Sequence, residues 1–324
     1  MVDVDELVAA ARVVRLPMRV RFRGITAREA VVFEGPAGWG EFGPFPEYDD
    51  AEAAHWLRAG IEAAYQGFPV PLRDAVPVNA TVPAVGPSRV PEVLARFPGC
   101  RVAKVKVAET GQTLAQDVAR VAAVRAAMPG AAIRVDANGG WTVDQAERAL
   151  TRLLDGGPLD YAEQPCATVE ELAEVRRRLG GACDIAADES IRRADDPMRV
   201  AQLGAADVAV VKVAPLGGVR AVLDVAAALK AAAGVRVTVS SALDTAVGLS
   251  AGIVAAACVP DGNAAGLGTG GFFTADLGEH PLVDGALRVR TVAPTEAQLA
   301  AVEVTGERRQ WWLDRLRRCH VLAG

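Results

Sequence analysis

The segment AIRVDANGGWTVDQAERALTRLLDGGPLDYAE, residues 132–163, contains one complete β/α/β unit. It begins with a strand-like run at 132–137, and a second such run follows at 159–163. Between the two runs, Thr142 and Gln145 have the spacing of a capping box, in which two side chains close the first turn of a helix. Two short strands joined by a helix are typical of parallel pairing. The segment therefore predicts a β/α fold.

The same alternation continues on both sides of this unit. Short strand-like runs recur between helical segments, and Thr168 and Glu171 form a second capping box. We predict eight strands, at residues 76–82, 101–107, 132–137, 159–163, 184–188, 207–212, 235–240 and, more weakly patterned, 263–267. This rhythm favours a modified TIM-type (β/α) barrel, in which active-site residues lie at the carboxyl ends of the strands.

The two ends of the chain do not show this β/α alternation. Residues 1–75 read as an antiparallel meander with Gly-Pro turns, followed by an amphipathic helix from about Asp49 to Gln66. Residues 285–324 read as one strand and a long helix. We therefore predict a barrel at 76–284 and an α+β capping domain at 1–75, on which the segment 285–324 packs.

Composition excludes several classes of protein. Net charge is −5 and no Lys/Arg block with interleaved aromatic residues occurs, which argues against a nucleic-acid-binding surface. No apolar run approaches the roughly 20 residues that span a bilayer, and the first residues lack the pattern of a secretion signal. The five cysteines are scattered without metal or disulfide spacing, which favours a reducing cytoplasm.

Lysine is rare in this chain, with four residues against thirty-one arginines. Two of the four, Lys104 and Lys106, lie in one predicted strand, and a third, Lys212, ends another. Residues two apart in a strand share a face, so Lys104 and Lys106 are expected to point into the barrel. A buried lysine can act as a base and an arginine cannot. The alternative is a structural ion pair with nearby acids.

Three acids end successive predicted strands. Asp136, Glu163 and Asp188 are 27 and 25 residues apart, about one β/α unit each, so they are expected at a similar height on neighbouring strands. A single strand-end acid often caps a helix or solvates a loop. Three that converge would repel one another unless a hard cation neutralised them. The pattern therefore predicts a Mg²⁺ site.

The K-x-K strand, DANGGW, YAEQP, AADES and the lysine that ends the sixth strand together resemble the enolase superfamily, muconate-lactonizing subgroup. The resemblance covers nearly the whole chain. It implies that Asp136, Glu163 and Asp188 bind Mg²⁺ and that Lys106 and Lys212 stand on opposite faces of a carboxylate substrate. With Lys106 as the base, removal of a proton next to the carboxylate would give an enediolate.

Two further stretches resemble the o-succinylbenzoate synthases of menaquinone biosynthesis: residues 19–48, and SSALDTAVGL (240–249) followed by GLGT (266–269). This resemblance implies syn dehydration of 2-succinyl-6-hydroxy-2,4-cyclohexadiene-1-carboxylate to o-succinylbenzoate. It places Ser240 and the backbone of Gly266 near the succinyl carboxylate. Independently of the resemblance, the glycines of this last stretch could offer backbone N–H groups to an anion.

The roles of three other residues have alternatives. Lys104 could contact substrate or form an ion pair with the acids. Arg134, on the same face as Asp136, could meet the succinyl anion or form an ion pair inside the barrel. Asn138 is predicted to support the metal site from outside its ligands. The family pattern usually has an acid where this chain has Gly268, and this departure bears on the substrate pocket.

Other activities of the superfamily fit less well. No histidine ends a predicted barrel strand, which excludes a His–Asp base pair, and the eighth strand lacks the Asp-x-Asp of dipeptide epimerases. An N-acylamino acid racemase, or a bifunctional racemase and synthase, remains the main alternative because it would use the same lysines and metal. A muconate-type cycloisomerase fits less well. A non-catalytic metal-binding barrel is disfavoured because both lysines accompany the three acids.

Overall fold

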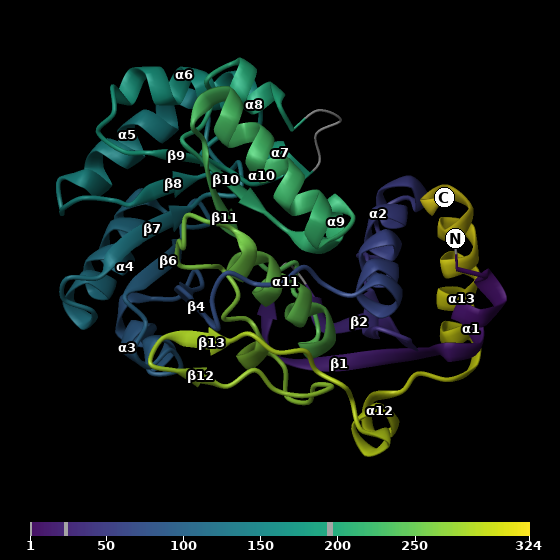
Figure 1. Cartoon of the computed structure of the whole chain (residues 1–324). Coiled ribbons are helices and arrows are strands. Elements are labelled where there is room, and N and C mark those ends of the chain that lie inside the picture. Colours follow the sequence, from purple (N-terminus) through teal and green to yellow (C-terminus); the bar gives the residue numbers. More distant parts are fainter. Residues whose placement is uncertain (1, 23–24, 193–196) are drawn as a thin grey trace.

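The computed structural model describes residues 2–22, 25–192 and 197–324, which form a β/α barrel and a smaller cap domain (Figure 1). Seven parallel strands follow one another around the barrel in sequence order. They are β5 (Ala80–Val82), β6 (Val102–Lys106), β7 (Ala132–Asp136), β8 (Tyr161–Glu163), β9 (Ile185–Ala187), β10 (Val208–Val211) and β11 (Arg236–Val239). The barrel interior is packed with small and β-branched side chains.

The barrel closes without a regular eighth strand. At the predicted position, Ala265 and Gly266 form only isolated parallel bridges, to Val78 and Ser240 respectively. The run NAAGL is short and ends in glycine, and it has few side chains that favour a strand. The bridges still join the two edges of the seven-stranded sheet, so the predicted modified barrel is confirmed.

The first predicted strand, 76–82, is divided in two. Its beginning, β4 (Ala75–Pro77), pairs with β13 (Ala286–Arg288), which also pairs with β12 (Leu282–Val283). Only its end, β5, enters the barrel. Pro77 has no N–H for a second ladder, which is consistent with an edge position. Residues 286–288, which we expected to pack on the cap domain, therefore lie against the barrel instead.

Helices surround the barrel between its strands (Figure 1). They are a 3₁₀ turn at Pro87–Arg89, α3 (Val90–Leu94), α4 (Leu114–Ala127), α5 (Val143–Leu154), α6 (Val169–Leu179), α7 (Glu189–Arg192), α8 (Arg199–Gln202), α9 (Val213–Leu216), α10 (Val219–Ala233) and α11 (Ala246–Cys258). A further 3₁₀ turn, at Gly270–Phe272, packs with the hydrophobic core of the cap domain. Both predicted capping boxes are confirmed, with Thr142 and Thr168 as the N-caps of α5 and α6.

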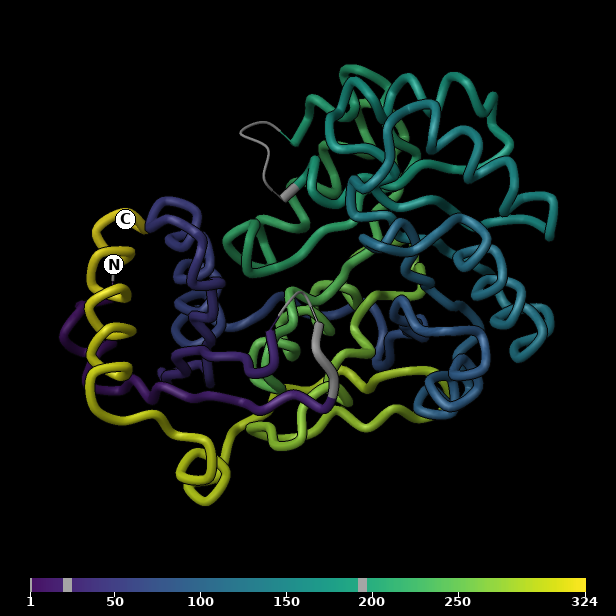
Figure 2. Tube along the Cα trace, turned by 180° about the vertical axis from the view of Figure 1, so that it is seen from behind, coloured from purple at the N-terminus to yellow at the C-terminus, as the bar shows by residue number. Residues whose placement is uncertain are grey.

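The cap domain combines both ends of the chain. It contains α1 (Val4–Ala10), the antiparallel strands β1 (Ala11–Phe22), β2 (Ile25–Gly35) and β3 (Gly38–Phe42), α2 (Asp50–Ile61) with a π-helical continuation at Glu62–Gln66, α12 (Glu296–Val302) and α13 (Gly306–Ala323). Figure 2 shows the two termini side by side. Arg318 of α13 donates to Asp50 at 2.6 Å, and Arg12 of β1 donates to Glu303, which follows α12, at 2.7 Å.

Two further findings bear on the class of protein. In the part of the chain that the structure describes, no helix combines the length and apolarity needed to cross a membrane. All five cysteines lie in described positions and are free thiols, four of them buried.

Candidate active site

Five predicted residues lie at the carboxyl ends of five consecutive barrel strands. Lys106 ends β6, Asp136 ends β7 and Glu163 ends β8, while Asp188 directly follows β9 and Lys212 directly follows β10. The register pairs Lys106 with Asp136, and Asp136 with Glu163. We call the three carboxylates the acidic row. The structure thus brings the acidic row together between one lysine on each side.

The two flanking lysines contact opposite ends of the acidic row. Lys106 Nζ donates to Asp136 Oδ2 at 2.5 Å and to Asn138 Oδ1 at 2.6 Å. Lys212 Nζ forms an ion pair with the Asp188 carboxylate. The Lys106 side chain is 17% exposed and that of Lys212 is 9% exposed, so both reach the barrel mouth from the interior. Asn138 also donates from its backbone N–H to Asp136 Oδ1 at 3.1 Å.

Lys104 lies one pleat deeper than Lys106. Its Nζ is 2.8 Å from Glu163 Oε1 and 3.1 Å from Asp136 Oδ2, and the residue is buried. These contacts support the ion-pair alternative that we considered for Lys104. Substrate contact by Lys104 stays a prediction.

Burial and charge act in opposite directions on the acidic row. Burial alone would raise the pKa of Asp136, but the ammonium groups of Lys106 and Lys104 outweigh it and hold that pKa well below its usual range. Burial, followed by repulsion from Asp136, raises the pKa of Glu163 to about 7. The three lysines match the three carboxylates in number, but burial and repulsion from Asp136 still disfavour the ionised form of Glu163.

The acidic row has the donor type that Mg²⁺ prefers, which is carboxylate oxygen. Within the described residues, however, no three His, Cys, Asp or Glu side chains already surround one point in a way that could hold a metal ion. Lysine nitrogens lie between the carboxylates, as Lys104 does between Asp136 and Glu163. The chemistry of the donor set fits Mg²⁺, and binding would require these side chains to re-orient.

Arg134 is engaged inside the barrel. Its guanidinium donates to Asp160 at 2.7 Å and to the carbonyl of Ala264 at 2.6 Å, and it lies 4.6 Å from the centre of the Tyr161 ring. These contacts tie the start of β8 to the irregular eighth strand. They support the structural ion pair that we weighed against substrate binding.

Ser240 and Gly266 meet where the barrel closes. A Cβ atom on Gly266 would lie 2.5 Å from Ser240 Oγ and 3.1 Å from Ser240 Cβ, so any larger residue there would require Ser240 to shift. The N–H of Gly266 donates to the carbonyl of Val239 at 2.8 Å. This N–H is therefore not free to bind an anion, because the barrel ladder already uses it. That the Gly266 backbone lies near the substrate carboxylate stays a prediction. Contact of Ser240 with substrate stays a prediction.

Buried carboxylates of the cap domain dock on barrel helices, and no local pattern in the sequence predicts these contacts. Glu41 of β3 accepts from Thr245 Oγ1 at 2.6 Å and from the N–H groups of Thr245 and Gly248 at 3.1 Å, at the start of α11. Glu62 accepts from the N–H of Val219 at 2.6 Å, at the start of α10. Both satisfy helix N-termini across the domain boundary, so they fix the cap relative to the barrel.

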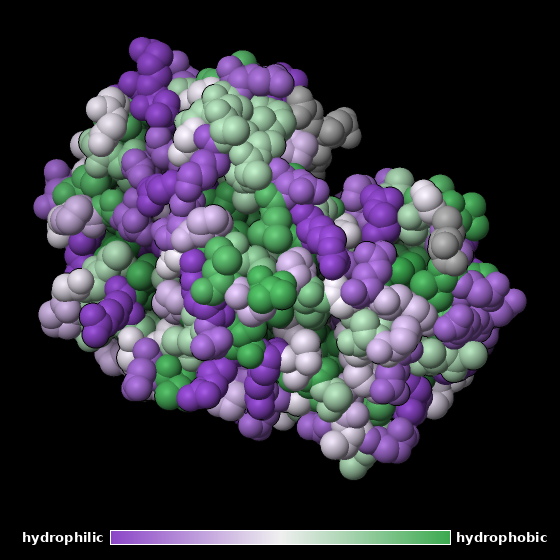
Figure 3. Space-filling view, viewed as in Figure 1, coloured by the Kyte–Doolittle hydropathy of each residue, from purple (hydrophilic) through white to green (hydrophobic). Residues whose placement is uncertain are grey.

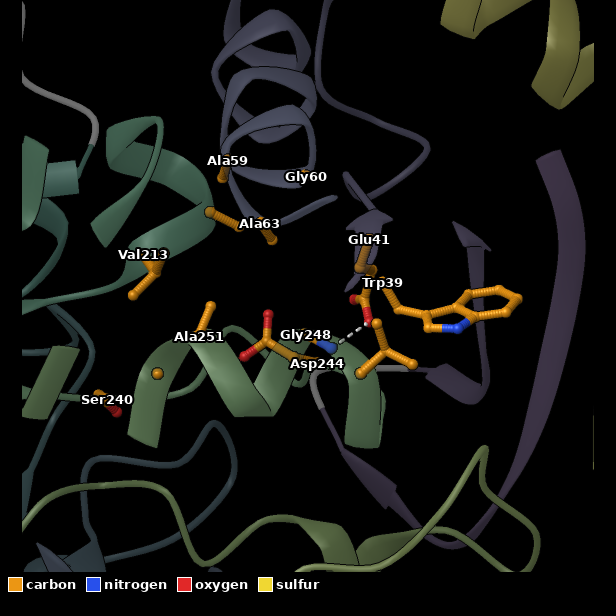
Figure 4. A pocket seen from close by; sticks show the side chains of 13 residues that line it. Trp39, Glu41, Ala59, Gly60, Ala63, Val213, Ser240, Asp244, Gly248 and Ala251 are labelled. Carbon is orange, nitrogen blue, oxygen red and sulfur yellow. Dashed lines mark hydrogen bonds between the residues drawn. The ribbon is translucent and has the colours of Figure 1, made fainter. Parts of the chain in front are cut away.

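A small cavity lies at this boundary (Figure 4), and the surface is notched between the two domains (Figure 3). The cavity has a volume of about 20 Å³, which is enough for about one water molecule. Glu41 reaches it from the cap, while Asp244 and Ser240 reach it from the barrel. Part of the cap domain therefore lies beside the carboxyl ends of the barrel strands.

The raised pKa of Glu41 predicts that the free energy of unfolding depends on pH. Burial, followed by the Asp244 carboxylate, raises its pKa from 4.5 to about 8, although Arg28 acts in the opposite direction. Between these two values the folded chain keeps a proton that the unfolded chain loses, so stability falls as the pH rises through this window, by at most about 1.4 kcal/mol per pH unit. We expect urea unfolding of Glu41→Gln to depend less on pH than that of the parent.

A matched variant sharpens this measurement. Asp244→Asn removes a neighbouring negative charge that raises the pKa of Glu41, so the loss of stability should end at a lower pH and be smaller in total than in the parent. Parallel pH profiles for the parent and Glu41→Gln would contradict the titration of Glu41 in this range.

The fold and the acidic row between two lysines define an enolase-like protein, and comparison with known families agrees. Residues 91–294 match the family described as "Enolase C-terminal domain-like", and residues 13–64 match "Enolase N-terminal domain-like". The solved structure of a muconate cycloisomerase from Pseudomonas fluorescens has the same fold, with a TM-score of 0.75 at 23% identity over 91% of this chain and 98% of that one.

Curated relatives narrow the assignment. An o-succinylbenzoate synthase of Mycobacterium ulcerans is 59% identical over 98% of this chain and 95% of its own length. One of Mycolicibacterium smegmatis is 58% identical over 98% of this chain and 97% of its own length. The chain belongs to the o-succinylbenzoate synthase family of the enolase superfamily.

Proposed function

We propose that the chain catalyses the syn dehydration of 2-succinyl-6-hydroxy-2,4-cyclohexadiene-1-carboxylate to o-succinylbenzoate, a step of menaquinone biosynthesis. The observation that carries this proposal is the acidic row with Lys106 at one end and Lys212 at the other. A small carboxylate substrate is the partner implied. A cytoplasmic location, suggested by the five free thiols, belongs to the same proposal.

The residues divide the reaction between them. Unprotonated Lys106 would remove the proton next to the substrate carboxylate, which leaves an enediolate, and would then return that proton to the departing hydroxyl. The C–H and C–O bonds break, water leaves, and the ring becomes aromatic. A single base suffices because both groups leave from one face. Lys212 would supply a positive charge on the opposite face.

Asp136, Glu163 and Asp188 are the residues that would hold Mg²⁺. When bound, Mg²⁺ supplies positive charge that stabilises negative charge developing on the substrate carboxylate. The chain's own part is to deliver three oxygen donors from adjacent strands. Asn138 would support Asp136 through its backbone N–H and would keep Lys106 oriented through its amide oxygen.

We expect chelation of divalent metal to abolish dehydration and added Mg²⁺ to restore it. Asp136→Asn, Glu163→Gln and Asp188→Asn should each weaken Mg²⁺ binding, measured by titration calorimetry, because each removes an anionic ligand. Asp184→Asn is the matched control, since Asp184 precedes the same strand that Asp188 follows and lies at the opposite end of the barrel. Full turnover in chelator, or parental Mg²⁺ affinity in all three ligand variants, would refute the metal assignment.

A racemase is the second candidate, because a base on each side of a planar intermediate is also what racemisation requires. The same two lysines would serve it, one for each face. The two functions differ in what they demand of Lys212, and this difference can be measured.

A further inference from the structure

Gln164 is a fully buried polar residue between Glu163 and Pro165, with no exposed surface. Its backbone φ of 40° lies in the left-handed region, which is uncommon for a residue with a side chain. Such a conformation persists only where surrounding contacts impose it. The mechanism above gives this residue no role.

Both the oxygen and the nitrogen of the Gln164 side-chain amide form hydrogen bonds. Its Oε1 accepts from the N–H of Asp188 at 3.0 Å and from the N–H of Ser190 at 3.2 Å. Its Nε2 donates to the carbonyl of Cys166 at 2.9 Å and to Ser190 Oγ at 2.8 Å. Oxygen meets two donors and nitrogen meets two acceptors, so the orientation of the amide is determined by its partners.

The backbone of Gln164 adds two connections. Its N–H donates to the carbonyl of Ala186 in β9 at 2.7 Å, and its carbonyl accepts from the N–H of Gly139 at 2.7 Å. Gly139 lies in the turn that follows Asp136. One residue therefore joins the ends of the three strands that carry the acidic row.

We propose that Gln164 is a positioning residue for the acidic row. It touches no reacting atom. Its side chain accepts a hydrogen bond from the backbone of Asp188, and its carbonyl accepts one from the turn after Asp136. It also directly follows Glu163 in the chain. This inference rests on the proposed function, because positioning matters only if the row binds Mg²⁺. Residues that orient metal ligands from outside typically change metal affinity by about 10–100-fold when replaced.

The test is Gln164→Met, which keeps approximate length and removes all four side-chain hydrogen bonds. We expect the Mg²⁺ dissociation constant, measured by calorimetry, to rise about 10–100-fold. Dehydration at saturating Mg²⁺ should recover to within about threefold of the parent, since the ligands themselves remain. Gln298→Met is the matched control: it removes the amide from the capping box of α12 in the cap domain and should leave Mg²⁺ affinity unchanged.

A second pair of variants decides the matter if Gln164→Met does not fold. Ser190→Ala removes one partner of the amide and should weaken Mg²⁺ binding in the same direction but less. Ser250→Ala removes a comparable buried hydroxyl from α11 and should not. Parental Mg²⁺ affinity in folded Gln164→Met, or in Ser190→Ala when that variant must decide, would overturn the inference.

The parent separates this failure from a failure of the proposed function. If the parent binds Mg²⁺ and Glu163→Gln does not, the metal assignment stands and only the role of Gln164 is in question. If the parent and Glu163→Gln bind Mg²⁺ equally, the proposed site is wrong, and the positioning role is overturned with it.

Discussion

Lys106→Arg is expected to lower the rate of dehydration by about 10²–10⁴-fold, the range that a general base contributes. Arginine keeps the positive charge beside Asp136 but does not give up its proton in a protein. Charge at this position would be preserved and the base would be lost. Single-turnover dehydration at saturating substrate and Mg²⁺ measures the effect on proton removal directly.

Lys230→Arg is the control for this substitution. Lys230 is exposed in α10 and pairs with Asp261 at 2.7 Å, so the same chemical change there should leave the rate unaltered. Mg²⁺ affinity of Lys106→Arg should stay within a few fold of the parent. A near-parental rate in Lys106→Arg would transfer the role of base to Lys212.

Lys212 separates the two candidate functions. In dehydration it supplies only a charge, which arginine also provides, so Lys212→Arg should lose about tenfold and Lys212→Ala about 10²–10³-fold, as for removal of one stabilising donor. A racemase must deliver a proton to the second face, and arginine cannot do so. Racemisation of N-acylamino acids, if the parent shows any, should therefore disappear in both variants.

Both reactions must be measured on both variants. Equal loss of dehydration in Lys212→Arg and Lys212→Ala would refute a purely electrostatic role. Racemisation that survives in Lys212→Arg would refute the assignment of Lys212 as the second base.

Much of this site follows from strand period alone. A strand places residues two apart on one face, and parallel strands end at one edge, so the sequence alone predicts that Lys106, Asp136 and Glu163 meet. The capping boxes at Thr142 and Thr168 marked where the intervening helices begin. Such local patterns carry their own physical meaning and need no knowledge of distant contacts.

Other features depend on contacts between distant segments. Nothing next to Glu41 in the sequence reveals that it caps α11, some two hundred residues later. Gln164 stood in a quoted motif, but only the structure shows which backbone groups its amide meets. The sequence does not distinguish substrate binding from a structural ion pair as the role of Arg134, because its partner Asp160 becomes adjacent only in the folded barrel. The prediction of a full eighth strand was wrong in extent, because it relied on the β/α alternation of the preceding segments. Residues 263–267 themselves have few side chains that favour a strand, and they form only isolated bridges.

The most direct test of the account is the conversion of 2-succinyl-6-hydroxy-2,4-cyclohexadiene-1-carboxylate by the purified chain with Mg²⁺, followed by loss of the diene absorbance, and compared with racemisation of N-acylamino acids. We predict stoichiometric o-succinylbenzoate, with kcat/KM of at least about 10⁴ M⁻¹s⁻¹ and above that for racemisation. No aromatic product, or racemisation more efficient than dehydration, would contradict the account.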